Sequence, residues 1–333
     1  MKKSKIPPII FVYEGDFPSY GYDSILINSY NTSNSIILIC DTKKIDKKKF
    51  SKRIKIYDTN SFYSNLNNLE VFNKYANYRN GFWIKALTRF FILNKFAEYK
   101  KLDSFYHLEL DNIISDISSL HLRLDKFPSK IFFSCYKKHG YGSFVYINKR
   151  NKLKKFCNFS LNQLKKKFLN DMELLGLFSK YYPKQTFKLP TIDDLHNEKK
   201  TNIIRICGGI FDEARVGVFL FGHDPRNYCN IVMNRRAYLT DKTSFATLKK
   251  IKFQINKKQF FLFNNNKKII IYNFHIHSKL FSHIFLKKKY KKIIKRINKN
   301  LDTIITYNIK NILKLFFLDF RYSRFITLIK RGI

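Results

Sequence analysis

The chain has 333 residues, of which 45% are hydrophobic and 26% are charged, the balance of a globular protein with a sizeable core. Its formal net charge of +40 attracts polyanions such as nucleic acid, anionic lipid or phosphorylated substrates. Five scattered cysteines without a Cys-x-x-Cys pair argue against a disulfide framework or a zinc knuckle and indicate a reducing compartment.

The N-terminal residues MKKSKIPPIIFVYEGD begin like a signal peptide, but the apolar run is short and Pro7 and Pro8 break it. No apolar run approaches the length of a transmembrane helix. We therefore expect a cytoplasmic protein, with any membrane contact peripheral and at the inner face.

The first part of the chain alternates strands and helices. Short β-branched runs predict strands within residues 6–16, 35–42 and 54–59, and residues 19–33 predict a helix. Residues 80–99 predict a long helix that leads into FYHLELDN at 105–112. This alternation predicts an α/β fold with a mostly parallel, twisted sheet and helices on both faces.

FYHLELDN places His107, Glu109 and Asp111 at every second position. In a strand, this alternation sends the three side chains to one face and Leu108 and Leu110 to the other. Ligands of open α/β sheets bind outside the carboxyl ends of the strands, and carboxylates gathered there need a cation or hydrogen-bond donors. An exposed turn is the alternative for the two acidic residues, and for His107 a packed or orienting role is favoured.

The rest of the chain predicts strands at 129–135 and 143–148, a helix over 160–182, and a short helical pattern over 212–221. Residues 267–279, KKIIIYNFHIHSK, alternate as a strand on which His275, His277 and Lys279 share one face. Glu109 and Asp111 with one imidazole could bind a divalent ion, with a lysine beside it for phosphate. Carboxylate-rich sites with few nitrogens suit Mn²⁺ or Mg²⁺ better than zinc.

Three motifs in this order resemble the GT-A glycosyltransferases of the bacterial polysaccharide type: FWIKALTRFFIL…FYHLELDN, GGIFDEARVGVFLFGHDPRN and NFHIHSK. The resemblance covers residues 8–283. It implies a GT-A-like, Rossmann-type sheet and a nucleotide-sugar donor, UDP-linked, whose diphosphate is bridged by a divalent metal. It also implies a glycan or lipid-linked acceptor in surface polysaccharide biosynthesis.

In this resemblance Glu109 and Asp111 stand where the family has Asp-x-Asp. The glutamate at the first position leaves open which carboxylate meets the metal and which meets the ribose. His275 or His277 would be the late histidine ligand, and Lys279 would contact the diphosphate.

Three further residues are candidates. Arg89 precedes the acidic motif on the long helix and would contact donor phosphate or ribose, or form a structural ion pair. Asp212 would be a catalytic base or an acceptor contact, or a helix N-cap. Asp41, at a strand end, would lie near the nucleotide base.

We expect one GT-A-like domain over residues 1–285, with a nucleotide-sugar half at about 1–125 and an acceptor half at about 126–285. Residues 286–333 predict a basic amphipathic helical tail that binds anionic membrane, with packing on the core or on a second subunit as the alternative. Two other functions stay open. A nucleic-acid-binding protein fits the charge, although no nucleic-acid motif is present and no such partner is expected. A metal-dependent phosphohydrolase or nuclease would keep the metal site.

Overall fold

The structure is a computed structural model. It describes residues 6–63, 70–75, 81–196, 198–221, 248, 251–255, 258–264, 267–279 and 281. The basic tail predicted over residues 286–333 lies outside the described residues, and its membrane role stays a prediction.

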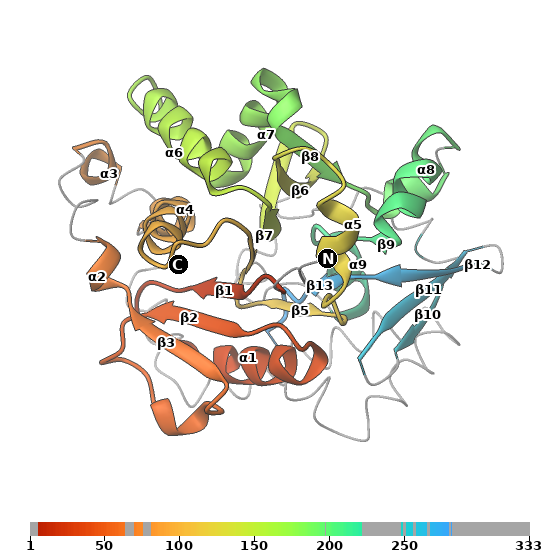
Figure 1. Ribbon diagram of the computed structural model, residues 1–333, viewed down its shortest axis with the longest axis horizontal. Helices are drawn as coiled ribbons and strands as arrows, with labels where there is room; N and C mark the ends of the chain where they lie inside the picture. The colour runs from red at the N-terminus through yellow and green to blue at the C-terminus, as the bar shows by residue number, and fades with distance from the viewer. Residues whose placement is uncertain are drawn as a thin grey trace, which may run out of the picture.

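The described strands and helices follow one another in the order of Figure 1. The strands are β1 (Ile9–Val12), β2 (Ile36–Cys40), β3 (Ile54–Asp58), β4 (Phe105–Leu108), β5 (Asn112–Ile114), β6 (Ile131–Tyr136), β7 (His139–Ile147), β8 (Thr186–Leu189), β9 (Gly209–Ile210), β10 (Lys252–Ile255), β11 (Phe260–Asn264), β12 (Lys267–Ile271) and β13 (Asn273–His275). The helices are α1 (Ser19–Asn31), α2 (Asn60–Tyr63), α3 (Glu70–Lys74), α4 (Phe82–Tyr99), α5 (Leu120–Leu124), α6 (Arg150–Leu164), α7 (Asp171–Tyr181), α8 (Glu198–Cys207) and α9 (Arg215–Phe221), with short 3₁₀ helices η1 (Lys47–Lys49), η3 (Pro183–Gln185) and η4 (Ile192–His196).

The main sheet has seven strands in the order β3-β2-β1-β4-β7-β6-β8. The first four are parallel, β7 is antiparallel to both β4 and β6, and β8 is parallel to β6. The order 3-2-1-4 is that of a doubly wound α/β half, so the carboxyl ends of β1, β2, β3 and β4 share one edge. The predicted α/β fold with a mostly parallel sheet flanked by helices is therefore confirmed.

Strand alternation divides the hydrophobic core between the two faces of this sheet. Ile10 and Val12 of β1 pack with α4, α6 and α7, which lie together above the sheet in Figure 1. Ile9 and Phe11, the intervening residues, pack on the other face with α1 and α5. Because both faces are covered, the central strands are continuous apolar runs, as the sequence indicated.

Two smaller sheets complete the described fold. One has the order β10-β11-β12-β9, and in the other β5 pairs antiparallel with β13. Buried side chains of α1 reinforce this short pair: Asn28 donates to Asn112 O at 2.8 Å, and Asn31 donates to Ile114 O at 2.8 Å. The β5–β13 pair joins the end of the main sheet to the late part of the chain.

Three predicted elements are corrected. Residues 105–112 are not one strand, because a turn closed by Asn112 N–H to Glu109 O at 3.0 Å follows β4. The helix predicted over 160–182 is divided into α6 and α7, because Asn170 and Glu173 form a capping box that starts a new helix. The strand predicted over 267–279 is divided into β12 and β13 and ends in a turn at Lys279.

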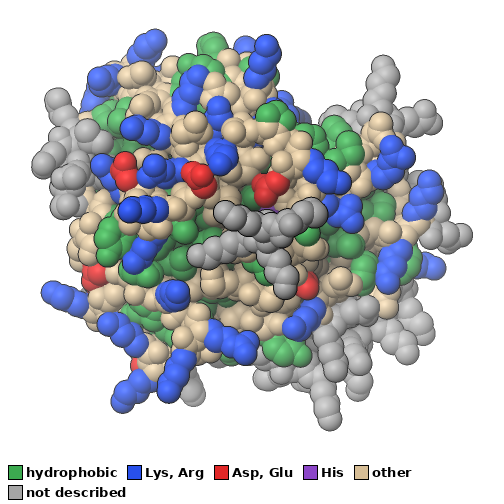
Figure 2. All heavy atoms as spheres, in the orientation of Figure 1, with side chains coloured by type: hydrophobic (Ala, Val, Ile, Leu, Met, Phe, Trp, Pro, Cys, Tyr) green, Lys and Arg blue, Asp and Glu red, His purple; other side chains and the backbone are tan. Residues whose placement is uncertain are grey.

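Lysine and arginine side chains are spread over the face in Figure 2 rather than gathered in one patch. Among the helices that the structure describes, none has the length and apolar character needed to cross a membrane. The division of the chain into a nucleotide-sugar half and an acceptor half stays a prediction.

Candidate functional site

The two acidic residues of FYHLELDN lie on the turn between β4 and β5. Glu109 N–H donates to Ser143 O of β7 at 3.1 Å, which extends the β4–β7 pairing by one residue. Asp111 ends the turn, directly before Asn112, the first residue of β5. Both carboxylates therefore leave the carboxyl end of β4, next to β1 in the parallel part of the sheet.

Strand β13 brings His275 to these carboxylates. His275 pairs with Asn112, and Ile276 N–H donates to Asp111 O at 2.7 Å. The chain then turns, with Lys279 N–H donating to Ile276 O at 3.1 Å and Lys279 in the left-handed region at φ 57°. This turn returns the Lys279 ammonium to the Asp111 carboxylate, which explains the spacing between the histidine and the lysine.

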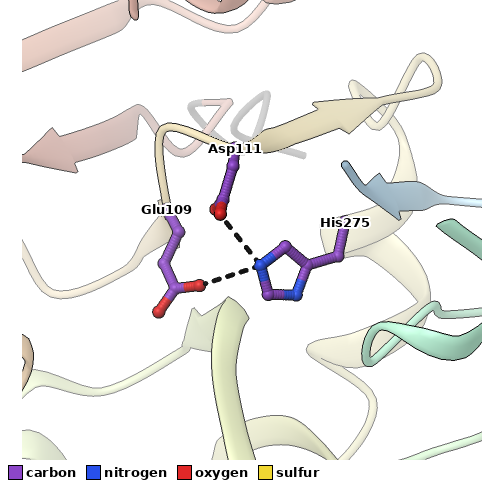
Figure 3. Close-up of side chains that lie close together, drawn as sticks. All are labelled: Glu109, Asp111 and His275. Atoms are coloured by element: carbon purple, nitrogen blue, oxygen red, sulfur yellow. Dashed lines mark ion pairs between the residues drawn. The ribbon is translucent and has the colours of Figure 1, made fainter. Parts of the chain in front are cut away.

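Glu109, Asp111 and His275 form one compact group (Figure 3). His275 Nε2 lies 3.4 Å from Glu109 Oε2 and 3.2 Å from Asp111 Oδ1. The three ligand atoms lie within 4.8 Å of one another. A divalent ion takes ligands at roughly 2.0–2.6 Å, so one ion is compatible with all three.

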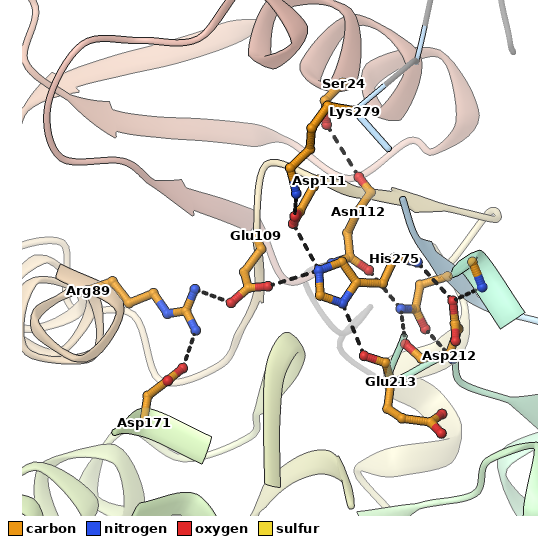
Figure 4. Close-up of polar contacts among 12 residues, drawn as sticks. Ser24, Arg89, Glu109, Asp111, Asn112, Asp171, Asp212, Glu213, His275 and Lys279 are labelled. Carbon is orange, nitrogen blue, oxygen red and sulfur yellow. Dashed lines mark hydrogen bonds and ion pairs between the residues drawn. The ribbon is translucent and has the colours of Figure 1, made fainter. Parts of the chain in front are cut away.

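The second oxygen of each carboxylate is held by a fixed cation. Glu109 Oε1 pairs with Arg89, which also binds Asp171, and Asp111 Oδ2 pairs with Lys279. Figure 4 shows the result as a row of side chains from Asp171 through Arg89, Glu109 and His275 to Asp111 and Lys279. Each carboxylate thus keeps one oxygen for the group around His275 Nε2.

The electrostatics of the group favour an ionised Asp111 carboxylate and a protonated His275. Burial would raise the pKa of Asp111, but the charges of Lys279, His275 and His277 outweigh it and hold this pKa well below its ordinary value. Burial alone would lower the pKa of His275, but Asp111 and Glu109 raise it to about 9. Without a metal, the imidazole therefore carries a proton between two carboxylates.

The donor set fits a metal ion of the Mn²⁺ or Mg²⁺ class. His275 Nδ1 lies 3.0 Å from the Glu213 carbonyl oxygen, to which it donates, so the neutral ring presents the Nε2 lone pair to the carboxylates. A backbone carbonyl behind a metal-binding histidine is a common orienting arrangement. Two hard carboxylate oxygens with a single imidazole nitrogen suit Mn²⁺ or Mg²⁺ better than zinc.

Asp212 lies behind His275 and is fully buried. Its carboxylate accepts backbone N–H groups from Val216 at 2.9 Å, Gly217 at 2.7 Å and His275 at 3.0 Å. Burial raises its pKa, although these hydrogen bonds oppose the rise. The contacts match the alternative in which Asp212 caps the start of a helix, here α9, and its catalytic role stays a prediction.

Three other candidates from the sequence, His277, His107 and Asp41, lie outside the group of three. The His277 ring packs against His275, with ring centroids 4.2 Å apart, and His277 is outside the set of three. His107 is buried against Phe90, and burial lowers its pKa to about 3, which agrees with a packed, neutral residue. Asp41 follows β2 at the same edge of the sheet, where its carboxylate accepts Lys43 N–H at 3.1 Å.

Sequence reasoning missed several residues that support the group. Asp171, the first residue of α7, binds Arg89 at 2.6 Å but was assigned to a helix interior. Asn273 bridges two segments, donating to Asn112 Oδ1 and to Asp212 O, both at 2.8 Å, and accepting from Asp212 N–H at 3.0 Å. No local pattern marks these residues, because each acts on a partner far away in the chain.

The chain is similar to several solved structures, all at low sequence identity. No family model and no curated protein matches the chain. Among solved structures, the chain is similar to mouse xyloside xylosyltransferase 1 (9% identity, 56% of this chain and 86% of that one, TM-score 0.39). It is also similar to the galactosyltransferase LgtC with donor and acceptor sugar analogs (13%, 87% and 95%, TM-score 0.41) and to the glycosyltransferase GlyE of Streptococcus pneumoniae TIGR4 (11%, 60% and 51%, TM-score 0.38). These three solved structures are glycosyltransferases, and they share between 9% and 13% of their residues with this chain.

Proposed function

We propose that this chain is a metal-dependent glycosyltransferase. It would move a sugar from a nucleotide-sugar donor, UDP-linked, to a glycan or lipid-linked acceptor in surface polysaccharide biosynthesis. One observation carries the proposal: Glu109, Asp111 and His275 converge at the carboxyl end of β4 and are flanked by two fixed cations.

The charge of this group favours a polyanionic ligand. Three carboxylates, those of Glu109, Asp111 and Asp171, stand against the cations of Arg89 and Lys279. Without a metal, protonated His275 makes the local formal charge zero, and a divalent ion that replaces this proton would make it one positive. A diphosphate is the kind of ligand that such a charge attracts in a partly buried site.

Each residue has a role in the proposed transfer. Glu109, Asp111 and His275 would hold Mn²⁺ or Mg²⁺, which when bound supplies positive charge to the leaving diphosphate. Lys279 would exchange its contact with Asp111 for a phosphate oxygen and stabilise the negative charge that develops there. His277, beside His275, would add a donor on the same side.

Asp212 has a different role in this proposal. Three backbone N–H groups hold its carboxylate, which is fully buried, so we assign it to positioning the loop behind His275. Asp41, on the same sheet edge, would face the nucleoside half of the donor.

The acceptor and location are part of the proposal. A lipid-linked glycan is presented at a membrane surface, so a basic tail over residues 286–333 would bring the chain to the inner face of the membrane. Sedimentation with anionic liposomes, comparing the full chain with one that ends at Leu286, tests this part. Equal, salt-insensitive partitioning of both would remove the tail from the proposal.

The central experiment is UDP binding with and without Mn²⁺, followed by Mn²⁺-dependent hydrolysis of a panel of nucleotide sugars. We expect UDP binding that requires the ion and turnover of at least one UDP-sugar. Metal-independent UDP binding would overturn the role of the acidic group. Hydrolysis of simple phosphate esters or nucleic acid, without any effect of UDP, would instead support the phosphohydrolase.

A further inference from the structure

Arg89 lies at the centre of a buried row of ion pairs that links Asp171 to Glu109, next to the other candidate metal ligands. Its side chain is 9% exposed, with Nη1 on Glu109 Oε1 and Nη2 on Asp171 Oδ2 at 2.6 Å. Its Nε–H has no acceptor among the residues that the structure describes. The two carboxylates therefore hold the guanidinium.

The geometry of arginine makes the two contacts interdependent. The guanidinium is planar and rigid, so a carboxylate that fixes one Nη atom also fixes the direction of the other. Glu109 is a flexible side chain, and freezing such a side chain costs conformational entropy. A pre-positioned Arg89 reduces this cost when Glu109 binds an ion.

Asp171 is itself firmly placed. It is the first residue of α7, where the helix dipole favours a carboxylate, and the capping box of Asn170 and Glu173 fixes the start of that helix. Its side chain is 4% exposed.

The space around Arg89 and Asp171 is closed by β7. A Cβ atom at Gly142 would lie 2.7 Å from Arg89 Nη2 and 3.4 Å from Asp171 Oδ2. Glycine at this position therefore makes room for the pair, and a side chain there would displace the guanidinium.

We propose that Asp171 is a positioning residue of the metal site: through Arg89 it holds Glu109 with Oε2 facing the ion. This inference rests on the proposed function, since it requires that Glu109, Asp111 and His275 bind a divalent cation. It also assigns Arg89 to the carboxylates rather than to donor phosphate. Residues that hold a ligand in place typically change metal affinity about 10- to 100-fold when they are lost.

The test is titration of the full chain with Mn²⁺ alone, by calorimetry. Asp171→Asn keeps the shape of the side chain and removes its charge, and we expect Mn²⁺ binding weakened about 10- to 100-fold. In a Glu109→Gln background the same substitution should have no further effect on Mn²⁺ affinity, because Arg89 then has no Glu109 carboxylate to hold in place. A purely structural role would weaken binding in both backgrounds.

Asp193→Asn is the matched control, because Asp193 also pairs with a buried arginine, Arg215, at 2.7 Å. We expect its Mn²⁺ affinity to equal that of the unaltered chain. If Asp171→Asn does not fold, Gly142→Ala tests the same row of ion pairs by displacing Arg89, again with and without Glu109→Gln.

The outcomes separate the inference from the proposed function. An unaltered chain that binds no Mn²⁺ would overturn both. Normal Mn²⁺ binding by the unaltered chain and by Asp171→Asn, or equal losses in both backgrounds, would overturn only the role of Asp171.

Discussion

Metal binding at the Glu109–Asp111–His275 group should depend steeply on pH. In the metal-free chain the neighbouring carboxylates raise the pKa of His275 to about 9, against the effect of burial. A metal-bound imidazole is neutral, so binding below this pH must release the proton. Because pH 7 lies two units below this pKa, removing the proton from the ring costs roughly 3 kcal/mol, or about 100-fold in apparent metal affinity.

Calorimetric titration with Mn²⁺ between about pH 6 and 8 measures this effect. The apparent Kd should fall about tenfold per pH unit, and buffers of different ionisation enthalpy should report about one proton released per ion. Burial also raises the pKa values of Glu14 and Glu213 to about 7, so His275→Gln serves as the control that isolates the imidazole. A Kd independent of pH, or the same slope in His275→Gln, would refute the reasoning.

Three other predictions concern the same region. Asp111→Asn should abolish Mn²⁺ binding and Mn²⁺-dependent turnover while circular dichroism stays unchanged; retained activity would remove its metal role. Gly217→Ala should destabilise the chain by about 1–3 kcal/mol in urea unfolding, because its Cβ would overlap the His275 carbonyl oxygen and lie 2.8 Å from Asp212 Oδ2. With EDTA present, protonated His275 should stabilise the fold, and this contribution is complete below about pH 6.5. Roughly 3 kcal/mol of unfolding free energy should be lost as the pH rises through about 9. Urea unfolding at about pH 6.5 and above about pH 9 measures the loss, and His275→Gln, which should not show it, is the control.

The sequence predicted the main sheet because its central strands are buried on both faces. Short, continuous apolar runs such as Ile9–Val12 and Ile36–Cys40 are typical of strands that are buried on both faces. The break between α6 and α7 was missed, because the helical pattern continues across it. The pairing of Asn170 with Glu173 starts α7 after α6 has ended at Leu164.

The candidate site was found through alternation along two strands, but alternation is not what forms it. Glu109 and Asp111 come together on a turn, and Lys279 approaches through a second turn with a left-handed residue. The side chains meet because of the shapes of these two turns, and the alternation of residues in the sequence does not reveal those shapes. Asp171 was missed for a related reason, because its partner Arg89 lies 82 positions earlier in the chain. Whether these residues bind metal stays a prediction.

The pairing of β5 with β13 should also make the site a late product of folding. It pairs Asn112 with His275, and the Asn273 side chain donates to Asn112 Oδ1 across 161 positions of the chain. The entropy of closing so long a loop grows only with the logarithm of its length, but contacts between distant residues slow folding. A nascent chain that has only its first half holds Glu109 and Asp111 without His275 or Lys279. Metal uptake would therefore report the docking of the late strand, and it would distinguish a completed chain from one in which only the main sheet has formed.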